Sequence, residues 1–414
     1  MHTTQAPRRV VAGRFYTAVL FDDLGDTAWL VALGWIAAQA HVSYEAGLVL
    51  LTSGIPQLLT LPAGGALSDK MGQPRTAAIT LGIRTLILVG WAFTISHNVG
   101  ALAAIAVANI AVGLISGLHA PAMASYPTAF TSGPGITTVT THSRQLSRAS
   151  QMLGGLGSGY VISGLGLTWL GVIAASCIAV AWLVSMTLAR DLPRGKKVEH
   201  APSLATTADN AVGGYHFVWA HPLLRFTLAV QVAGSAIAAA AVLVVLPFKA
   251  TSLGLSATAY GFGFGLYGLG MVLGASVARL QGMSLRKQLT AAAALTVVTG
   301  AAGLLLAFSW NLPSLMAGAF LLGGALSPVG PTMTGYLLQT AQRQEEEYGT
   351  SVVGRASALL VLVTDAMEPF VMCLAAFATA LPGGVTTPAA FLAVVCCLVG
   401  LMTWRRVSAD THEL

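Results

Sequence analysis

The chain has 414 residues, of which 55% are hydrophobic and only 9% are charged, whereas an average soluble domain has about 25% charged residues. This composition excludes an ordinary soluble protein, because most of its surface has too few polar groups to be solvated by water. The net charge is +6, but the basic residues lie between apolar stretches, so they indicate membrane topology and not affinity for nucleic acid.

Apolar stretches of about 20 residues recur along the whole chain, and each is long enough to cross a bilayer as a helix. The first follows MHTTQAPRRVVAGRF and has no small-residue cleavage site, so we expect a retained span and not a signal peptide. The hydrophobicity predicts twelve spans, at residues 15–38, 46–67, 76–96, 99–121, 149–168, 171–189, 224–247, 258–279, 288–308, 313–338, 355–380 and 388–404.

The longest polar interval lies between the sixth and seventh spans. We therefore predict an all-α membrane protein with two six-helix halves, residues 1–189 and 224–414, joined by a cytoplasmic linker at 190–223. Every Lys and Arg except Lys249 and Arg84 falls on one side of this topology, and the positive-inside rule places that side, with both termini, in the cytoplasm. Arginine outnumbers lysine, and alanine and glycine are abundant, which favours a bacterium and its inner membrane.

Carboxylates inside predicted spans are the leading functional residues. A charge at the centre of a membrane helix costs roughly 2.5–3.5 kcal/mol on insertion scales, so such residues normally face a cavity or a partner. Asp22 and Asp26 of the first span are four residues apart and share a helix face, as do Asp365 and Glu368 of the eleventh, three apart. We expect these pairs to bind a proton or a substrate in a central cavity, with Asp26 first and Glu368 second in importance.

Arg84 in the third span offers a static alternative for some of these carboxylates. Asp22 or Asp23 could form a neutralising ion pair with this arginine. Asp365 could instead cap a local polar cluster. His119, near the cytoplasmic end of the fourth span, is expected to be a buried or interfacial histidine more than a proton relay.

Several other side chains in the spans could line a substrate cavity, although aromatic residues in spans mostly pack against helices or lipid. These residues are Asn109, His119, Trp29, Trp35, Tyr260, Tyr267 and Phe370. Pro328 and Pro331 predict a kink in the tenth span. The histidines and cysteines have no metal-ligand spacing and no phosphate-binding loop is present, so we expect no cofactor, no metal and no direct ATP coupling.

The segment GALSDKMGQPR follows the second span and combines two glycines with acidic and basic residues. It resembles the loop signature of the major facilitator superfamily, in the one loop where that family has it. The resemblance implies a tight cytoplasmic turn and a conformational latch, in which Asp69 is attracted to the positive end of the eleventh helix; the alternative is a solvated loop charge. The residues of this motif are Gly65, Asp69, Lys70, Gly72, Arg75 and, on the eleventh helix, Arg355.

Three further segments extend the resemblance, namely LGDTAWLVALGWIA, LTLPAGGALSD and GYHFVWAHPLLRF. They resemble the macrolide, siderophore and multidrug exporters of the superfamily. Many proton-coupled drug exporters have an arginine where this chain has Asn109, which is a departure. Glycines with small-xxx-small spacing, Gly155 with Gly159 and Gly270 with Gly274, permit close helix contact, and the resemblance implies that the fifth and eighth spans face each other across the halves.

The resemblance implies a secondary transporter and not an enzyme. We expect an antiporter that exports small, partly apolar organic molecules by alternating access, as a monomer whose partners are the substrate, protons and the lipid bilayer. One alternative is a metal-ion exporter resembling ferroportins, whose first span also has Gly-Asp followed closely by tryptophan. The other is a membrane receptor or assembly factor that uses the same fold without transporting anything.

Overall fold

The structure is a computed structural model that describes residues 8–39, 43–96, 101–131, 134–192, 215, 218–219, 221–277, 284–348, 359 and 368–409. All regular secondary structure in these ranges is helical. Contacts along the chain divide it into two compact units. Unit 1 comprises Met1–Leu33 and Leu48–Leu204, and unit 2 comprises Gly34–Gly47 and Ala205–Leu414.

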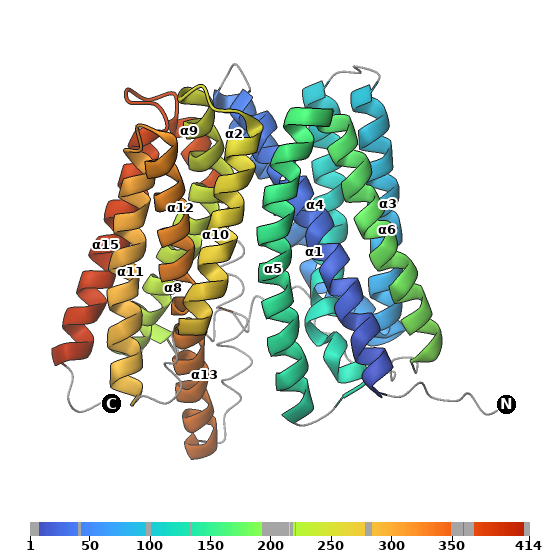
Figure 1. The fold of residues 1–414 in the computed structure, drawn as a ribbon. Helices are drawn as coiled ribbons and strands as arrows, with labels where there is room; N and C mark the ends of the chain where they lie inside the picture. Colours follow the sequence, from blue (N-terminus) through green and yellow to red (C-terminus); the bar gives the residue numbers. More distant parts are fainter. Residues whose placement is uncertain are drawn as a thin grey trace. The chain divides into compact units, whose positions relative to one another are not determined.

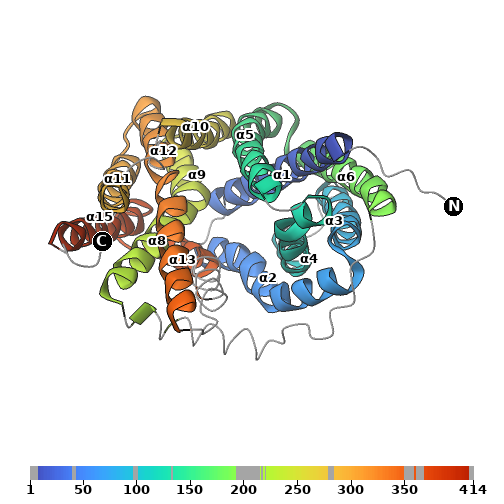
Figure 2. The ribbon, with the colours of Figure 1, turned by 90° about the horizontal axis from the view of Figure 1, so that it is seen from below.

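Unit 1 is a helical bundle in which α3 lies beside both α6 and α4 (Figures 1 and 2). The contact between α3 and α6 is close because a glycine on each helix receives a tryptophan of the other. A Cβ on Gly82 would lie 2.9 Å from the indole nitrogen of Trp182, and one on Gly171 would lie 2.6 Å from the ring of Trp91. The helices of this unit are α1 (Arg8–Gln39) as far as Leu33, α2 (Ser43–Met71) from Leu48 onward, α3 (Gln73–Ser96), α4 (Ala101–Ser125), the short η1 (Tyr126–Ala129), α5 (Pro134–Leu165) and α6 (Leu167–Asp191).

Several helix boundaries in unit 1 differ from the sequence prediction, and two of these differences concern the site and the motif. Helix α5 begins at Pro134 and not at 149, because its first turns are rich in Thr, Ser and Arg and a hydrophobicity window misses an amphipathic helix. Helix α2 continues to Met71 and not to 67. The motif that was expected to be a loop therefore forms the last turns of α2.

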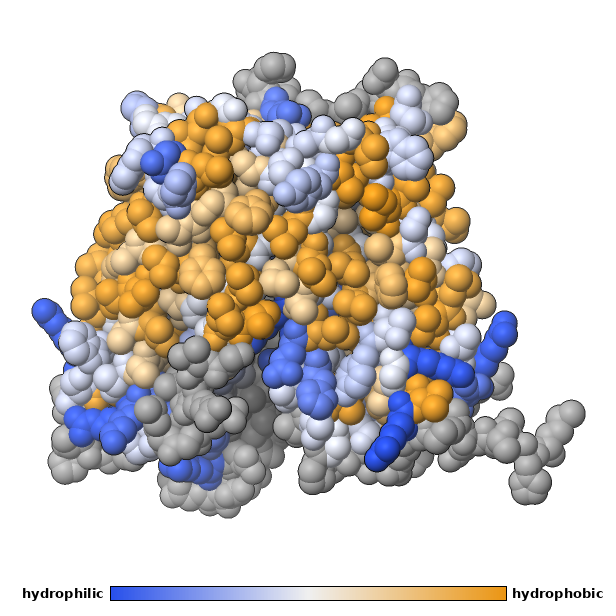
Figure 3. All heavy atoms as spheres, viewed as in Figure 1, coloured by the Kyte–Doolittle hydropathy of each residue, from blue (hydrophilic) through white to orange (hydrophobic). Residues whose placement is uncertain are grey.

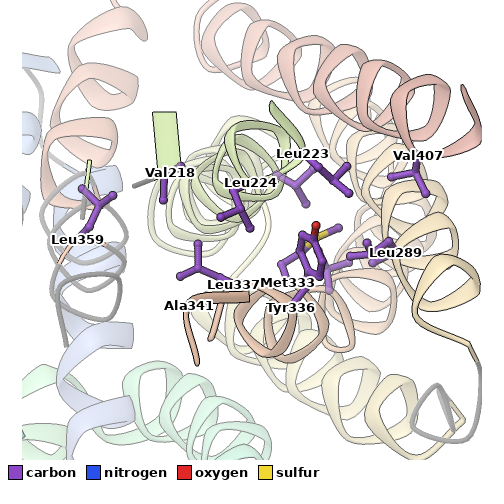
Figure 4. Packing of buried hydrophobic residues seen from close by; sticks show 13 residues of the cluster. Val218, Leu223, Leu224, Leu289, Met333, Tyr336, Leu337, Ala341, Leu359 and Val407 are labelled. Carbon is purple, nitrogen blue, oxygen red and sulfur yellow. The ribbon is translucent and has the colours of Figure 1, made fainter. Parts of the chain in front are cut away.

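Unit 2 places α11 beside α15 and α12, and α10 beside α12. Its buried apolar side chains include Leu224, Leu289 and Met333, which come from three different helices and meet in one cluster (Figure 4). The helices are α8 (Pro222–Ala240), the π-helical η2 (Ala241–Val245), α9 (Leu246–Ser252), α10 (Ala257–Val277), α11 (Leu285–Ala307), α12 (Leu312–Leu326), α13 (Val329–Tyr348), a helical segment at 368–378 and α15 (Thr386–Ala409).

Glycines bring α10 and α12 into backbone contact. A Cβ on Gly270 or Gly274 would meet the backbone of Phe320 or Gly324, and the hydroxyl of Ser327 donates to the carbonyl of Met271 at 2.7 Å. The close contact predicted for the Gly270 and Gly274 pair is thus present, with α12 of the same unit as the partner. The predicted kink is also present, as a break between α12 and α13.

The apolar surface of the helices indicates that they lie in a membrane. Seven helices of the described part are long and apolar enough to span a bilayer by length and composition. Apolar residues form a band over the middle of the helices, and hydrophilic residues gather mainly below it (Figure 3). Helix α1 is not among the seven, because it carries Asp22, Asp23 and Asp26. The prediction of an all-α, multi-pass membrane protein is confirmed.

Candidate functional site

Four charged or titratable side chains from three helices meet inside unit 1. Helix α1 supplies Asp22 and Asp26, α3 supplies Arg84, and α4 supplies His119. We call these four residues the charge cluster. The spacing of four residues on α1 places both carboxylates on the face that meets α3. The two carboxylates lie about halfway along α1, which runs from Arg8 to Gln39.

Arg84 is the centre of the charge cluster. One terminal nitrogen of its guanidinium donates to Oδ1 of Asp22 at 3.0 Å, and the other pairs with Oδ1 of Asp26. The Arg84 and Asp22 side chains are 2% and 8% exposed, whereas the Asp26 side chain is 40% exposed. Asp26 is therefore the accessible end of the cluster. The suggested pair between Asp23 and Arg84 is not formed, because Asp23 lies on another face of α1.

His119 forms the buried end of the charge cluster. Its Nε2 lies 2.9 Å from Oδ2 of Asp22, and its Nδ1 lies 2.8 Å from the hydroxyl oxygen of Thr80 on α3. The histidine side chain is 7% exposed. The expectation of a buried histidine is met, but both ring nitrogens are engaged in the polar network, which the sequence alone did not indicate.

The Asp23 side chain forms a hydrogen bond with a different helix, α5. Its Oδ2 accepts a hydrogen bond of 2.5 Å from the hydroxyl of Ser147 on α5. The hydroxyl of Ser150, one turn further along, contacts the carbonyl oxygen of Leu20 at 3.4 Å. These two contacts join α1 to α5 on the side away from Arg84. Neither Ser147 nor Thr80 was expected from the sequence, because a lone hydroxyl on a helix has no distinctive pattern.

The charge cluster is not electrically balanced by Arg84 alone. Two carboxylates and one guanidinium sum to −1 when His119 is neutral, and one bound proton brings the sum to zero. Asp23 adds a neighbouring carboxylate, whose described partner is the uncharged Ser147. Charge inside a membrane is costly unless it is paired, and this arrangement leaves one surplus negative charge when His119 is neutral.

Most residues predicted to line a cavity are packed against other side chains in this conformation. Trp29 packs edge-on against Trp91 of α3, and Trp35 stacks on Tyr260 within unit 2. Asn109 is fully buried, and its amide nitrogen donates to the Val49 carbonyl at 2.6 Å. The substrate contacts of these residues stay predictions.

The remaining predicted residues of unit 2 are only partly described. Tyr267 is buried, and its carbonyl faces Gly323 of α12, whereas Phe370 is 49% exposed. Glu368 is exposed and engages a polar or charged partner. Asp365 lies outside the described residues, so its pairing with Glu368 stays a prediction.

The motif that joins α2 and α3 contains a one-residue turn. Gly72 has φ 88°, a conformation that favours glycine, and its amide donates to the Ser68 carbonyl at 2.9 Å. The tight turn expected from the motif is present at this glycine. Gly65 lies inside α2, with Asp69 and Lys70 in its last turn. Arg75 lies in the first turn of α3, and the proposed latch partner Arg355 lies outside the described residues.

A groove of about 400 Å³ lies elsewhere on unit 1, between α3 and α6. It is lined by apolar and hydroxyl side chains, with Phe93 and Val172 among the exposed ones. No charged side chain lines it. The groove is therefore not part of the charge cluster.

Residues 15–367 match the family model of the Major Facilitator Superfamily. The chain belongs to the major facilitator superfamily. The predicted fold class, with the twelve-helix architecture of this superfamily, is supported by the match over most of the chain. As a superfamily member, the protein has the fold of a transporter, and neither the family nor the structures below point to an enzyme.

Solved structures of superfamily transporters are similar over nearly the whole chain. The nucleoside transporter NupG, solved as a point mutant, has a TM-score of 0.71 at 12% identity and covers 95% of this chain and 99% of its own. A bacterial homologue of the iron transporter ferroportin in an inward-facing state has a TM-score of 0.70 at 13% identity. This match covers 98% of the present chain and 100% of the homologue. The human organic anion transporter MFSD10 (TETRAN) has a TM-score of 0.65 at 18% identity. This match covers 96% of the present chain and 100% of the human transporter.

These three identities show a shared fold and not a shared substrate. Comparison with curated protein sequences gave no significant match. The substrate of this superfamily member must therefore be inferred from its own site.

Proposed function

We propose that the protein is a proton-coupled secondary transporter that exports small, partly apolar organic molecules by alternating access. It would work as a monomer in the inner membrane of a bacterium, with both termini in the cytoplasm. The superfamily fold supports transport in general. Export and proton coupling are supported by the resemblance of three segments to drug and siderophore exporters and by the charge cluster.

The observation that carries this proposal is the unbalanced charge of the cluster at the middle of α1. A static structural ion pair would need one carboxylate for Arg84, whereas this arginine contacts two. The surplus negative charge has an accessible end at Asp26. A group that binds a proton or a cation in exchange needs both features, a surplus charge and access to it.

The first experiment identifies a substrate. The protein is expressed in an efflux-deficient bacterium, and a broad panel of organic compounds is tested for reduced accumulation with and without an uncoupler. We expect protection against at least one compound that disappears when the proton gradient is collapsed. Protection that survives the uncoupler contradicts proton coupling.

Replacing Asp26 with asparagine is expected to abolish proton movement linked to substrate, because the cluster then sums to zero without a bound proton. The Asp22 pair with Arg84 is retained, so the variant should still insert and fold. The measurement is substrate-induced acidification or alkalinisation in proteoliposomes that contain a pH-sensitive dye.

Asp191→Asn is the matched control for this variant. Asp191 also pairs with an arginine, Arg14 at 2.7 Å, and its side chain is also 40% exposed, but it lies at the end of α6. This control should keep normal coupling. If Asp26→Asn keeps it too, Asp26 has no part in the mechanism.

The rival functions have less support. The described residues contain no group of three or more His, Cys, Asp or Glu side chains arranged to hold a metal ion, the kind of site that a metal-ion exporter would need. A receptor or assembly factor without transport activity would move no compound in liposomes that contain folded protein.

A further inference from the structure

We propose that His119 takes up and releases the coupling proton, and that the cation exchanged for it is a positively charged, partly apolar organic molecule bound at Asp26. This inference rests on the proposed function and deepens it, because it names the residue that carries the proton and the charge of the substrate. The sequence alone predicted Asp26 as the leading site for either a proton or a substrate.

The hydroxyl of Thr80 can form a hydrogen bond with His119 both when the histidine is neutral and when it is charged. Its oxygen lies 2.8 Å from Nδ1 of the histidine, 2.8 Å from the Thr76 carbonyl and 3.0 Å from the Ala77 carbonyl. A hydroxyl has one hydrogen to donate and two lone pairs to accept with. It can therefore donate to the ring in one state and accept from the ring in the other.

Two protonation states of His119 satisfy every polar atom around the ring. In the neutral state, Thr80 donates to Nδ1, and the Nε2–H group donates to Asp22. In the charged state, the added proton is on Nδ1, which donates to Thr80, while the Thr80 hydroxyl turns to the Thr76 carbonyl. The change requires rotation of one hydroxyl and no movement of the backbone.

The charge of His119 reaches Asp26 through Arg84. Asp22 faces His119 from α1, and Arg84 and Thr80 face the same site from α3. When His119 is charged, it compensates Asp22, and Arg84 can compensate Asp26. When His119 is neutral, Arg84 is shared by two carboxylates, and the surplus negative charge is left at the exposed end, on Asp26.

The same cluster thus holds either a proton at its buried end or a cation at its exposed end. The bound states with one cation are neutral, and the state with both is positively charged and disfavoured in the membrane interior. This mutual exclusion is what an exchanger requires. The remaining nearby carboxylate, Asp23, is engaged by Ser147 of α5 on another face.

The test measures uptake of a lipophilic cation dye into inverted vesicles as a function of pH, with His119→Asn compared with wild type. Gradient-driven accumulation is expected to fall roughly 5–150-fold, the usual range of coupling between two ligand sites, and the dependence of accumulation on pH is expected to flatten. Downhill movement of the dye without a pH gradient should persist. His142→Asn is the control, because His142 is an exposed histidine of the same unit on α5.

Thr80 variants supply a second test that does not remove the histidine. Thr80→Val removes the acceptor of the charged Nδ1–H group, and hydrogen bonds to charged groups are the stronger ones. The charged state loses more than the neutral state, so the pH profile should shift to lower pH. Thr80→Ser should restore the profile of the wild type. If His119→Asn does not fold, these variants decide the question.

The outcomes separate this inference from the proposed function. Wild-type protein that accumulates no compound in response to a proton gradient refutes the proposed function itself. A second outcome is that the wild type couples transport to the proton gradient, but folded His119→Asn or Thr80→Val has the same pH profile as the wild type. This outcome refutes only the role of His119. Gradient-driven transport of neutral or anionic compounds alone refutes the cationic substrate.

Discussion

Replacing Arg84 with methionine is expected to destabilise the protein more than any other single change in the charge cluster. Methionine has a similar length but leaves Asp22 and Asp26 without their shared cation. Removing one partner of a buried ion pair costs about 3–5 kcal/mol, and the Arg84 side chain is only 2% exposed. The expected result is a large loss of purified monodisperse protein and a lower thermal unfolding temperature in detergent.

The control for this prediction is Arg14→Met. Arg14 forms a 2.7 Å ion pair with Asp191, in which both side chains are about 40% exposed, and exposed pairs contribute only about 0–1 kcal/mol. Adding Asp22→Asn to Arg84→Met should recover part of the stability without recovering transport, because the buried carboxylate is then uncharged. If Arg84→Met unfolds at the temperature of the control, the cluster does not hold these helices together.

Replacing Gly274 with alanine is expected to have the second large effect, through the contact of α10 with α12. The added Cβ would meet the carbonyl oxygen of Gly324, and a backbone group cannot rotate away as a side chain can. Overpacking of this kind costs typically about 1–3 kcal/mol. The thermal unfolding temperature should therefore fall, and the fall should be larger with leucine than with alanine.

Gly335→Ala in α13 is the matched control, because nothing lies within 4 Å of a Cβ built on Gly335. Alanine is a better helix former than glycine by about 1 kcal/mol, so this variant should be unchanged or more stable. The two Gly-to-Ala substitutions thus have opposite expected signs. Equal unfolding temperatures for the two variants would show that the close approach at Gly274 is not needed.

Composition and helical spacing were enough to predict much of this protein. The all-helical membrane fold followed from the apolar stretches. The shared face of Asp22 and Asp26 followed from their four-residue spacing. The break near Pro328 followed from the missing amide hydrogen of proline. Each of these inferences depends on residues that are close in the chain.

The rest depends on how helices are rotated about their axes, which one sequence does not reveal. Nothing local distinguishes the Thr80 hydroxyl, which reaches His119 on α4, from that of Thr85, which bonds the Leu81 carbonyl of its own helix. Because of the way α1 is rotated about its axis, Asp22 and Asp26 face Arg84 of α3. Asp23 faces Ser147 of α5 instead. The start of α5 was missed for another reason, since a polar helix outside the apolar core has no hydrophobic signal.

The turn at Gly72 connects the cluster to the end of α2. Only this residue separates α2 from α3, so the angle between the two helices depends on very few backbone dihedrals. Arg84 lies on α3 about 16 Å from the turn, at 1.5 Å per residue. A small change in the dihedral angles of Gly72 is therefore magnified along this lever arm into a larger displacement of the Arg84 guanidinium.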